Sequence, residues 1–384
     1  MTSEDTPRLA PKWINHHAIK VVETLQKKGF TSYIVGGCVR DLLVGIIPKD
    51  FDLVTNAKPR QIKKCISNAF IIGRRFRLVL VKRGELQIEV ATFRRNKNEG
   101  DIDEVDLEGE PIKVGDNYFG SPEEDASRRD FTVNALLYNP ADGKVIDYCN
   151  GLPDLKNRVI RIIGDPQARI VEDSVRIFRA IRLSHKLNFS IESELKKAIC
   201  KNSKVIESAV LPRRREEFLK FLKLKNPSAA FLEAKDLGIL QYVAPLINEA
   251  LDNNEFVHRL REKPEVLNHK SPSQLFSFLI WAYYRSQVSA STYAPCKSKQ
   301  LLEDEKLKSL MRDELGMFNY EQMRCCRALQ LQTELPEVVK APKEKQKVII
   351  QKKYFHIALM YAKLDVSLSA KEFTFLQKFV PNEK

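Results

Sequence analysis

Three carboxylates stand where they could bind divalent cations. Asp50 and Asp52 alternate in the segment DFDLVT, which predicts a strand with both side chains on one face. Glu89 lies in a second predicted strand, LQIEVATF, and would complete the site if the two strands are neighbours. Adjacent carboxylates repel unless a cation lies between them, and hard oxygen ligands suit Mg²⁺. Two such ions can hold the attacking and leaving oxygens of phosphoryl transfer. The alternatives are surplus acids on a solvent-facing strand and a surface glutamate on an edge strand.

A glycine pair precedes the first two carboxylates. Gly36 and Gly37 follow the short apolar strand YIV and open the predicted helix CVRDLL. Because glycine has no Cβ, a phosphate can approach the backbone there, and a helix N-terminus offers N–H donors. Arg40, one turn into the helix, could hold a phosphate oxygen. Taken alone, such a pair more often marks a plain turn.

A second group of polar residues lies in RRDFTVNALLY. The segment predicts a helix on which Asp130 and Asn134, four residues apart, share a face. A carboxylate and an amide so placed can bind ribose hydroxyls. Arg128 and Arg129, at the start of that helix, could reach a triphosphate. The alternative is a capped helix with a solvated basic end.

A row of arginines runs along the predicted helix EDSVRIFRAIRL. Asp173 and Arg176 are three residues apart, and Arg179 and Arg182 continue the row beside a row of apolar residues. An arginine can donate to N1 of adenine while an aspartate accepts from its amine. The same pair suits cytosine and rejects guanine and uracil, so the protein would act as its own template for ATP or CTP. The alternative is an ordinary ion pair on a surface helix.

The segment LPRRREEFLKFLKLK predicts a basic helix. Arg213, Arg214 and Arg215 could follow an RNA backbone, or they could brace the arginine-row helix through Glu216 or Glu217. A solvated helix end fits the same residues.

Charge and composition favour a polyanionic partner. The 384 residues carry a formal net charge of +14. Residues 99–125 hold eleven acids and one lysine, so the rest of the chain is more strongly basic. Each phosphate that a basic surface neutralises releases counterions, which favours nucleic acid binding. An inert basic surface is the alternative.

The order of patterns predicts an α/β part followed by helices. Strand-like segments occur from residue 32 to about 150, residues 96–127 read as an acidic surface loop, and strands nearly vanish after about residue 170. The segment APKEKQK (341–347) is interpreted as an exposed linker or turn. No apolar run is long enough to span a membrane, and the first residues do not resemble a signal peptide. Seven cysteines without CxxC pairs argue against a disulfide framework, so a cytoplasmic location is expected.

Taken together and in order, the segments GGCVRD…KDFDLVT, RRDFTVNALLYNP, NGLPDLKNRVIR and EDSVRIFRAIRL resemble the class II tRNA nucleotidyltransferase and bacterial poly(A) polymerase family. The resemblance covers about residues 30–250. The stretches IIGRRFRLVLV and DNYFGSPEEDASRRDFT are similar to the poly(A) polymerase branch. Ser174 and Pro212 depart from the family pattern, which usually has proline and glutamate at these positions.

The resemblance implies an α+β fold class. It predicts a polymerase β-type nucleotidyltransferase head in residues 1–160, a helical neck for base recognition and RNA binding in residues 161–250, and an RNA-binding helical body and tail in residues 251–384. It implies Asp50 and Asp52 as metal ligands with Glu89 as the third carboxylate, and Asp130 at the ribose. Glu172, Asp173 and Arg176 would then contact the incoming base.

The sequence therefore predicts a template-independent enzyme that transfers AMP from ATP to RNA 3′ ends, with two Mg²⁺ ions and release of pyrophosphate. CCA, CC or A addition to tRNA is the alternative within the same class. A non-catalytic RNA-binding relative is the alternative outside it, and the intact pair of acids at positions 50 and 52 speaks against that alternative.

Overall fold

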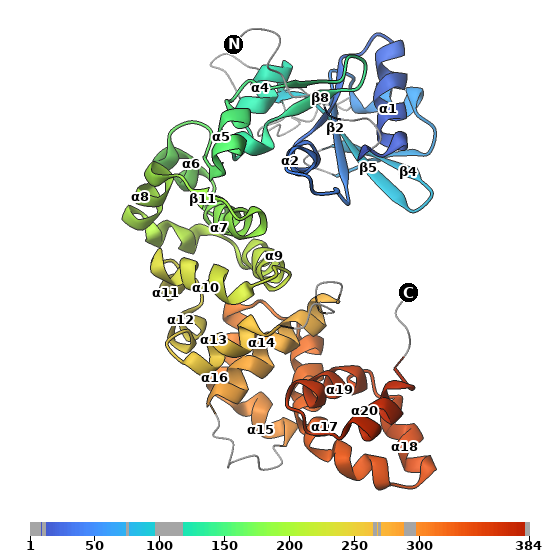
Figure 1. Ribbon diagram of the computed structural model, residues 1–384, viewed down its shortest axis with the longest axis vertical. Helices are drawn as coiled ribbons and strands as arrows, with labels where there is room; N and C mark the ends of the chain where they lie inside the picture. The colour runs from blue at the N-terminus through green and yellow to red at the C-terminus, as the bar shows by residue number, and fades with distance from the viewer. Residues whose placement is uncertain are drawn as a thin grey trace, which may run out of the picture. The chain divides into compact units, whose positions relative to one another are not determined.

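A computed structural model describes residue 9 and residues 13–73, 77–96, 118–263, 267, 270–287 and 297–380. The chain divides into two compact units (Figure 1). Unit 1 comprises Met1–Arg169 and Phe189–Leu195, and unit 2 comprises Ile170–Asn188 and Lys196–Lys384. Residues 251–384 and most of residues 161–250 therefore share unit 2, although the sequence assigns them to separate domains.

Unit 1 is built on a mixed sheet. Within the described residues, seven strands are ordered β3-β4-β5-β2-β1-β8-β9, so β2 lies in the middle. It pairs in parallel with β5 and antiparallel with β1. The strands predicted at DFDLVT, LVLVK and LQIEVATF are confirmed as β2, β4 and β5. The strand bounds are β1 (Ser32–Val35), β2 (Phe51–Thr55), β3 (Ala69–Ile72), β4 (Leu78–Arg83), β5 (Leu86–Thr92), β8 (Leu137–Asn139) and β9 (Lys144–Ile146).

The two faces of this sheet differ because side chains alternate along a strand. One face carries the larger core, in which Leu53 and Ile88 pack with the apolar side of α1 (His16–Lys27). The opposite face carries a smaller apolar cluster that includes Val54. Asp52 has the parity of Val54 and therefore lies on the face with the smaller cluster. Apolar burial on the other side fixes which way this carboxylate points.

Short helices and strand pairs complete unit 1. The bounds are α2 (Gly37–Leu43), α3 (Pro59–Cys65), α4 (Pro122–Ser127), α5 (Gly151–Asn157), β6 (Arg94–Arg95) with β7 (Tyr118–Phe119), and β10 (Val159–Ile160) with β11 (Ser190–Ile191). The acidic loop predicted over 96–127 is wrong for its last ten residues, which contain β7 and α4. Residues 97–117 of that loop lie outside the described residues, as do residues 74–76 of the stretch IIGRRFRLVLV.

The described part of unit 2 is helical, which confirms the predicted change from strands to helices near residue 170 (Figure 1). The segment 341–347, predicted as an exposed linker or turn, is helical from Lys343, where α18 begins, so the prediction holds only for residues 341 and 342. The helix bounds are α6 (Pro166–Glu172, shared with unit 1), α7 (Val175–Leu187), α8 (Ser193–Lys201, also shared with unit 1), a 3₁₀ helix (Ser203–Ser208), α9 (Leu211–Leu222), α10 (Pro227–Asp236), α11 (Leu240–Val243), α12 (Pro245–Ala250), α13 (Asn254–Arg261), α14 (Pro272–Gln287), α15 (Ser298–Glu303), α16 (Glu305–Ser309), a π-helix (Leu310–Glu314), α17 (Asn319–Lys340), α18 (Lys343–Ile350), α19 (Phe355–Leu364) and α20 (Ala370–Gln377).

Aromatic side chains join the first long helices of unit 2. Phe178 of α7 lies edge-to-face with Phe218 and Phe221 of α9, at ring-centroid distances of 5.2 and 5.8 Å. Phe231 of α10 stacks on Phe218 at 5.9 Å. These four rings are fully buried, so the arginine row of α7 stands on a rigid support.

Candidate active site

Strand pairing brings two of the three predicted carboxylates together. Asp52 in β2 is the direct register partner of Glu89 in β5, and on its other side it pairs with Val35, the last residue of β1. Asp50 lies just before β2 and not within it, so the prediction that both aspartates are strand residues is wrong for Asp50. All three side chains are exposed. The predicted adjacency of the two strands is confirmed.

The electrostatics of Asp52 show that these acids act on one another. Loss of hydration raises the pKa of Asp52 above its ordinary value, and repulsion by Glu89 and Asp50 raises this pKa further. The Arg129 guanidinium acts in the opposite direction. Although the carboxylate remains open to solvent, its neighbours remove part of its hydration and add negative charge. A bound cation would relieve both effects, because it favours the ionised form.

These acids fit a divalent cation by their chemistry. All three donors are carboxylate oxygens, and repulsion by Glu89 and Asp50 adds to the loss of hydration that raises the pKa of Asp52. Among the described residues, no three His, Cys, Asp or Glu side chains lie close enough together to form a metal site without moving. Small side-chain rotations would therefore have to accompany metal binding at the exposed carboxylates.

Arg129 links the carboxylates to the glycine turn. Gly36 has a φ of +84°, which favours glycine, and a Cβ built on it would lie 3.4 Å from Nη1 of Arg129. Arg129 also forms an ion pair of 2.9 Å with Asp125 of α4. Asp125 was not identified from the sequence. A positively charged group thus lies beside the glycine turn that follows β1 and acts on Asp52 of β2.

The segment RRDFTVNALLY brings its polar residues together without the predicted helix. It contains a bend, a 3₁₀ turn (Thr132–Asn134) and the start of β8, so the predicted helical spacing is wrong. Nonetheless, Asn134 Nδ2 donates to Asp130 Oδ1 over 3.0 Å, and the backbone N–H of Phe131 donates to the same oxygen over 2.8 Å. The turn achieves the pairing that the helix was expected to provide.

Arg40 is buried, and its contact with a phosphate stays a prediction. Its Nε donates to Asp41 over 2.9 Å, and its Nη1 donates to Asn134 Oδ1. The guanidinium still lies close to the glycine turn, because a Cβ on Gly37 would lie 3.5 Å from its Nη2. Arg40 therefore orients the amide of Asn134, which in turn holds Asp130.

Arg128 and Arg129 follow a helix and do not begin one, because α4 ends at Ser127. Arg128 Nε donates to Asn96 Oδ1 over 3.1 Å. The backbone carbonyls of Arg128 and Arg129 both accept from Nη2 of Arg169, over 2.8 and 2.7 Å. Arg169 was not identified from the sequence, because no local pattern connects it with residues forty positions earlier.

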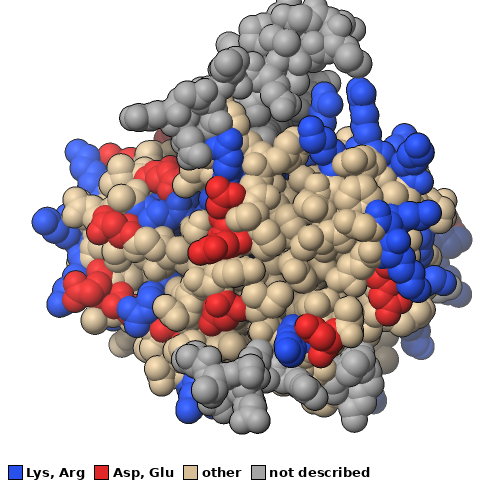
Figure 2. Space-filling view, turned by 90° about the horizontal axis from the view of Figure 1, so that it is seen from above, with Lys and Arg blue, Asp and Glu red and all other residues tan. Residues whose placement is uncertain are grey.

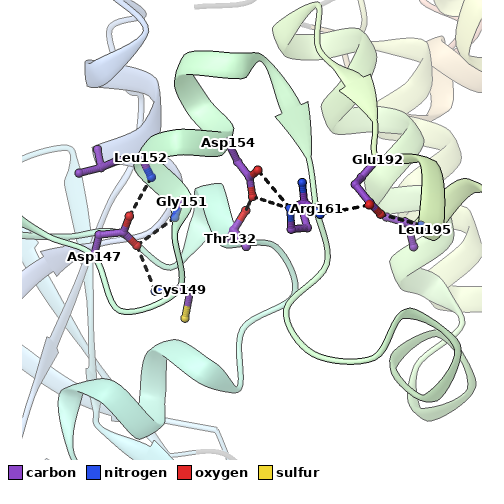
Figure 3. Close-up of polar contacts among 9 residues, drawn as sticks. All are labelled: Thr132, Asp147, Cys149, Gly151, Leu152, Asp154, Arg161, Glu192 and Leu195. Atoms are coloured by element: carbon purple, nitrogen blue, oxygen red, sulfur yellow. Dashed lines mark hydrogen bonds and ion pairs between the residues drawn. The ribbon is translucent and has the colours of Figure 1, made fainter. Parts of the chain in front are cut away.

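A polar network centred on the buried Thr132 and Asp154 supports the turn that holds Asp130 and Asn134 (Figure 3). Thr132 donates from its hydroxyl to Asp154 over 2.7 Å, and Arg161 Nε donates to both Asp154 oxygens over 3.1 Å. Arg161 also forms an ion pair of 3.1 Å with Glu192. Asp147 accepts backbone N–H groups at the start of α5, including that of Gly151 over 2.9 Å. The motif NGLPDLKNRVIR thus supplies supports for the turn and not site residues.

Gly151 permits the close approach of α5 to this turn. A Cβ at Gly151 would lie 2.3 Å from the carbonyl oxygen of Thr132 and 2.9 Å from its carbonyl carbon. Both are backbone atoms, so they cannot rotate away. The site residues of the turn therefore depend on a missing side chain about seventeen residues later.

In unit 2, the residues that were predicted to recognise the base form ion pairs with other partners than the sequence suggested. Asp173 accepts two bonds of 2.8 Å from Arg213 of α9, and Arg176 pairs with Glu172 over 2.7 Å. The alternative of an ordinary Asp173–Arg176 ion pair is therefore not what forms, and the contact of both residues with a base stays a prediction. The arginine row is confirmed in part: Arg176, Arg179 and Arg182 are half-buried along α7, and Arg182 pairs with Glu217 over 2.7 Å.

The three arginines of α9 have separate structural partners. Arg213 binds Asp173, and Arg214 Nη1 donates to the carbonyl of Val243 over 3.0 Å. Arg215 is buried and pairs with Glu321 of α17 over 2.9 Å. This burial does not fit the predicted contact of Arg215 with an RNA backbone. The bracing role of the segment is realised by Glu217, which holds Arg182.

The surface charge is uneven. On the face in Figure 2, Lys and Arg side chains gather along the rim, acidic side chains form small groups, and a broad central area is uncharged. Charged side chains are thus unevenly distributed over that face. In the described residues no helix combines the length and apolar character needed to cross a membrane.

Comparisons with known proteins agree with these motifs. A family model described as the poly A polymerase head domain matches residues 32–161, and one described as a probable RNA- and SrmB-binding site of polymerase A matches residues 188–251. Poly(A) polymerase I of Haemophilus influenzae is 37% identical over 292 residues, which cover 73% of this chain and 65% of that protein. Poly(A) polymerase I of Salmonella typhi is 38% identical over 285 residues, covering 71% and 61%. These matches thus span less than two thirds of either relative.

A CCA-adding enzyme of Ligilactobacillus salivarius is 36% identical over 225 residues, which cover 59% of this chain and 54% of that enzyme. Among solved structures, the Bacillus stearothermophilus CCA-adding enzyme in complex with CTP aligns with a TM-score of 0.56 and 20% identity, over 94% of this chain and 96% of that one. A CCA-adding enzyme in complex with ATP gives a TM-score of 0.57 and 22% identity, over 98% and 79%. The predicted fold class, an α+β head followed by helices, is confirmed.

Replacement of Gly151 by alanine tests the support of the turn. Gly151→Ala should lower the free energy of unfolding by about 2–3 kcal/mol, because the added methyl group overlaps the Thr132 backbone. Denaturant unfolding followed by circular dichroism measures the loss. Gly143→Ala is the control: a Cβ there meets no atom within 4 Å, and only its φ of +70° opposes the change, at about 1 kcal/mol. Equal losses would contradict the close approach.

The raised pKa of Asp52 predicts a stability gain on its neutralisation. Because the folded state raises the pKa of this carboxyl, its ionised form costs stability at neutral pH, and this cost disappears below the ordinary pKa of 3.8. Asp52→Asn should therefore stabilise the metal-free protein at neutral pH but not in acid. Added Mg²⁺ should stabilise the native protein more than the variant. Thermal unfolding at several pH values measures both effects, with the exposed Glu85→Gln as the control. A variant that is less stable at neutral pH would refute the repulsion.

Proposed function

Because the chain belongs to the family of bacterial poly(A) polymerases and CCA-adding enzymes, we propose that it is a template-independent nucleotidyltransferase that acts on RNA 3′ ends. The observation that carries the proposal is the register pairing of Asp52 with Glu89, together with the charges of Asp50 and Arg129 that act on Asp52 beside a glycine turn. Asp52 is coupled to Glu89, Asp50 and Arg129, and Arg129 lies against Gly36. A nucleotide with its metal ions needs carboxylates for the cations and an arginine for the phosphates.

Asp50 and Asp52 would hold two Mg²⁺ ions, with Glu89 as the third carboxylate. Bound there, the ions would supply activation of the RNA 3′-hydroxyl and neutralisation of the pyrophosphate that leaves. The register of Asp52 with Glu89 supports this assignment, because it puts two carboxylates on one face of the sheet. The chain itself positions the carboxylates of Asp52 and Glu89, because both residues belong to a rigid sheet.

Arg129 would contact the triphosphate of ATP over the turn formed by Gly36 and Gly37, with Arg128 farther out. Its ion pair with Asp125 and the two carbonyl bonds from Arg169 limit where the guanidinium can lie. Asp130 and Asn134 would bind the ribose hydroxyls. Their mutual bond, and the bond from Arg40 to Asn134, set the direction of each polar atom before the nucleotide arrives.

Base choice would belong to Asp173 and Arg176, with Glu172 and Arg179 beside them. Asp173 is held by Arg213, and Arg176 by Glu172. These pairs would keep the carboxylate and the guanidinium in place as acceptor and donor for the Watson–Crick edge of adenine. Cytosine presents the same order of groups, so this contact alone does not separate ATP from CTP.

For the product we propose poly(A) addition, with ATP as the substrate. The matches to poly(A) polymerase I cover 71–73% of the chain, whereas those to CCA-adding enzymes cover 58–59%. Addition of CCA to tRNA is the second candidate, because the chain aligns with solved CCA-adding enzymes over more than 90% of its length.

One assay separates these candidates. The purified protein is given a generic RNA, or a tRNA that ends before CCA, with each nucleoside triphosphate alone and with all four. Long adenylate tails on the generic RNA are the expected result. Addition that stops after CCA and requires tRNA would establish the second candidate. RNA binding without Mg²⁺-dependent pyrophosphate release would refute both and indicate a non-catalytic RNA-binding protein.

Removal of either aspartate tests the proposed metal ligands. Asp50→Ala and Asp52→Ala should each reduce AMP incorporation by at least about a thousandfold, because metal ions contribute several kcal/mol to the transition state. Circular dichroism should show a folded protein in both cases, since both side chains are exposed. Glu85→Ala, at the exposed turn between β4 and β5, is the control and should retain full activity. Normal incorporation by either aspartate variant would refute the assignment.

Replacement of Arg176 tests base choice. Arg176→Ala should relax the preference for ATP, because the variant lacks the donor to the base. The total rate of incorporation should fall by a smaller factor than the preference for ATP does. The ratio of kcat/KM for ATP to that for GTP and UTP measures the effect. Arg182→Gln, six residues along α7 and paired with Glu217, is the control and should leave this ratio unchanged. An unaltered ratio in the Arg176 variant would show that another group reads the base.

A further inference from the structure

An exposed pair of aromatic rings stands at the start of α17. Phe318 and Tyr320 are 56% and 49% exposed, and their rings stack with centroids 5.9 Å apart and an interplanar angle of 14°. The guanidinium carbon of Arg324 lies 5.1 Å from the centroid of the Tyr320 ring. Parallel aromatic rings beside a cation are the arrangement on which proteins stack unpaired nucleic acid bases.

The ring of Phe318 is held in place by a buried ion pair. The Arg215 guanidinium lies between two rings, 4.6 Å from the centroid of Phe318 and 4.9 Å from that of the buried Phe276. It binds both carboxylate oxygens of Glu321 over 2.9 and 3.0 Å. Glu321 in turn accepts the backbone N–H of Phe318 over 2.8 Å. The exposed ring is therefore held in place before any partner binds, which lowers the entropic cost of binding.

The charged side chains of residues 318–327 that reach the surface are basic. Tyr320, Met323, Arg324 and Arg327 occur at spacings of three, four and seven residues and so share one face of α17. Met323 and Arg327 are exposed, and Arg324 is half-buried. Glu321 is the one acid in residues 318–327, and it is buried in its pair with Arg215. The charge on this face thus suits a polyanion.

We propose that Phe318 and Tyr320 form a stacking platform for unpaired bases of single-stranded RNA, with Arg324 and Arg327 meeting its phosphates. The identity of the ligand rests on the proposed function, which makes RNA the substrate. Duplex RNA cannot use the rings in this way, because its bases are already stacked inside the helix. Arg215 is then a positioning residue: it supports RNA binding by fixing Phe318 and does not touch phosphate.

The test compares RNA affinity with and without the rings. Fluorescence anisotropy measures the binding of the full chain to a fluorescein-labelled single-stranded oligoadenylate and to a duplex RNA of equal length. The double variant Phe318→Ala/Tyr320→Ala should bind the single strand about tenfold more weakly or worse, and the duplex as before. The dependence of log Kd on log salt should not change, because no charge is lost. Arg324→Gln/Arg327→Gln should instead reduce this slope by about 1.4.

A second exposed aromatic pair provides the control. Phe375 and Phe379 on α20 and just after it are 36% and 43% exposed, but they meet edge-to-face at 78°. Phe375→Ala/Phe379→Ala removes as many rings and should leave both affinities unchanged. Phe318→Tyr/Tyr320→Phe keeps both rings and should bind as the native protein does.

The outcomes separate this proposal from the proposed function. Unchanged single-strand affinity in the Phe318/Tyr320 variant, or an equal loss for duplex RNA, would overturn the platform whatever the activity, and would leave docking of a protein as the use of these rings. Absence of pyrophosphate release by the native protein with bound RNA would refute the proposed function, while the comparison of affinities would still decide the platform.

Discussion

Repulsion between carboxylates on one face of a sheet is the constraint on which the candidate site depends. The parallel register of β2 and β5 makes Asp52 and Glu89 direct partners, and Asp50 adds its charge at the start of β2. The fold bears this cost because the opposite faces of the same strands are buried: Leu53, Ile88 and Val90 hold β2 and β5 in the larger core. A one-residue shift of either strand would bring apolar side chains to the surface, so the sheet cannot slip to separate the acids.

Buried polar bonds transmit this rigidity to the residues outside the sheet. Asp130 and Asn134 stand on a turn, which by itself would allow many conformations. Arg40 fixes the turn from α2, and Asp154 fixes it from α5 through Thr132. Each of these supports is satisfied by hydrogen bonds, which is the condition under which a buried charge stabilises a single arrangement. Thr132, which supports the turn, therefore lies between the two candidate site residues Asp130 and Asn134.

Arginines in unit 2 divide between support and surface. Arg213 holds Asp173, and Arg215 holds Glu321 and the ring of Phe318. Arg324 lies over an exposed ring. The bidentate geometry of a guanidinium suits the first two tasks, because it fixes a carboxylate in direction as well as in distance. A basic stretch in a sequence is thus no measure of how many of its charges face a polyanion.

The sequence by itself determined the central strands and the change to helices near residue 170, because apolar alternation in DFDLVT and LQIEVATF and helical spacing in EDSVRIFRAIRL follow from which side chains must leave water. It also determined that Asp52 and Glu89 could share a face, since parity along a strand is local. Gly36 was identified because a missing Cβ would let a phosphate approach the backbone, and the structure adds a positive φ at this position.

Partner choice was decided only by the tertiary structure. Asp173 pairs with Arg213 and not with Arg176, Arg215 is buried against Glu321, and Arg169 holds carbonyls forty residues away. The Asp130–Asn134 pair formed on a turn where spacing predicted a helix, because contacts from α2 and α5 outweighed local helical preference. A local pattern states which partners a charged side chain can reach along its own element. Which partner it takes depends on the elements that packing brings beside it, and these come from distant parts of the chain.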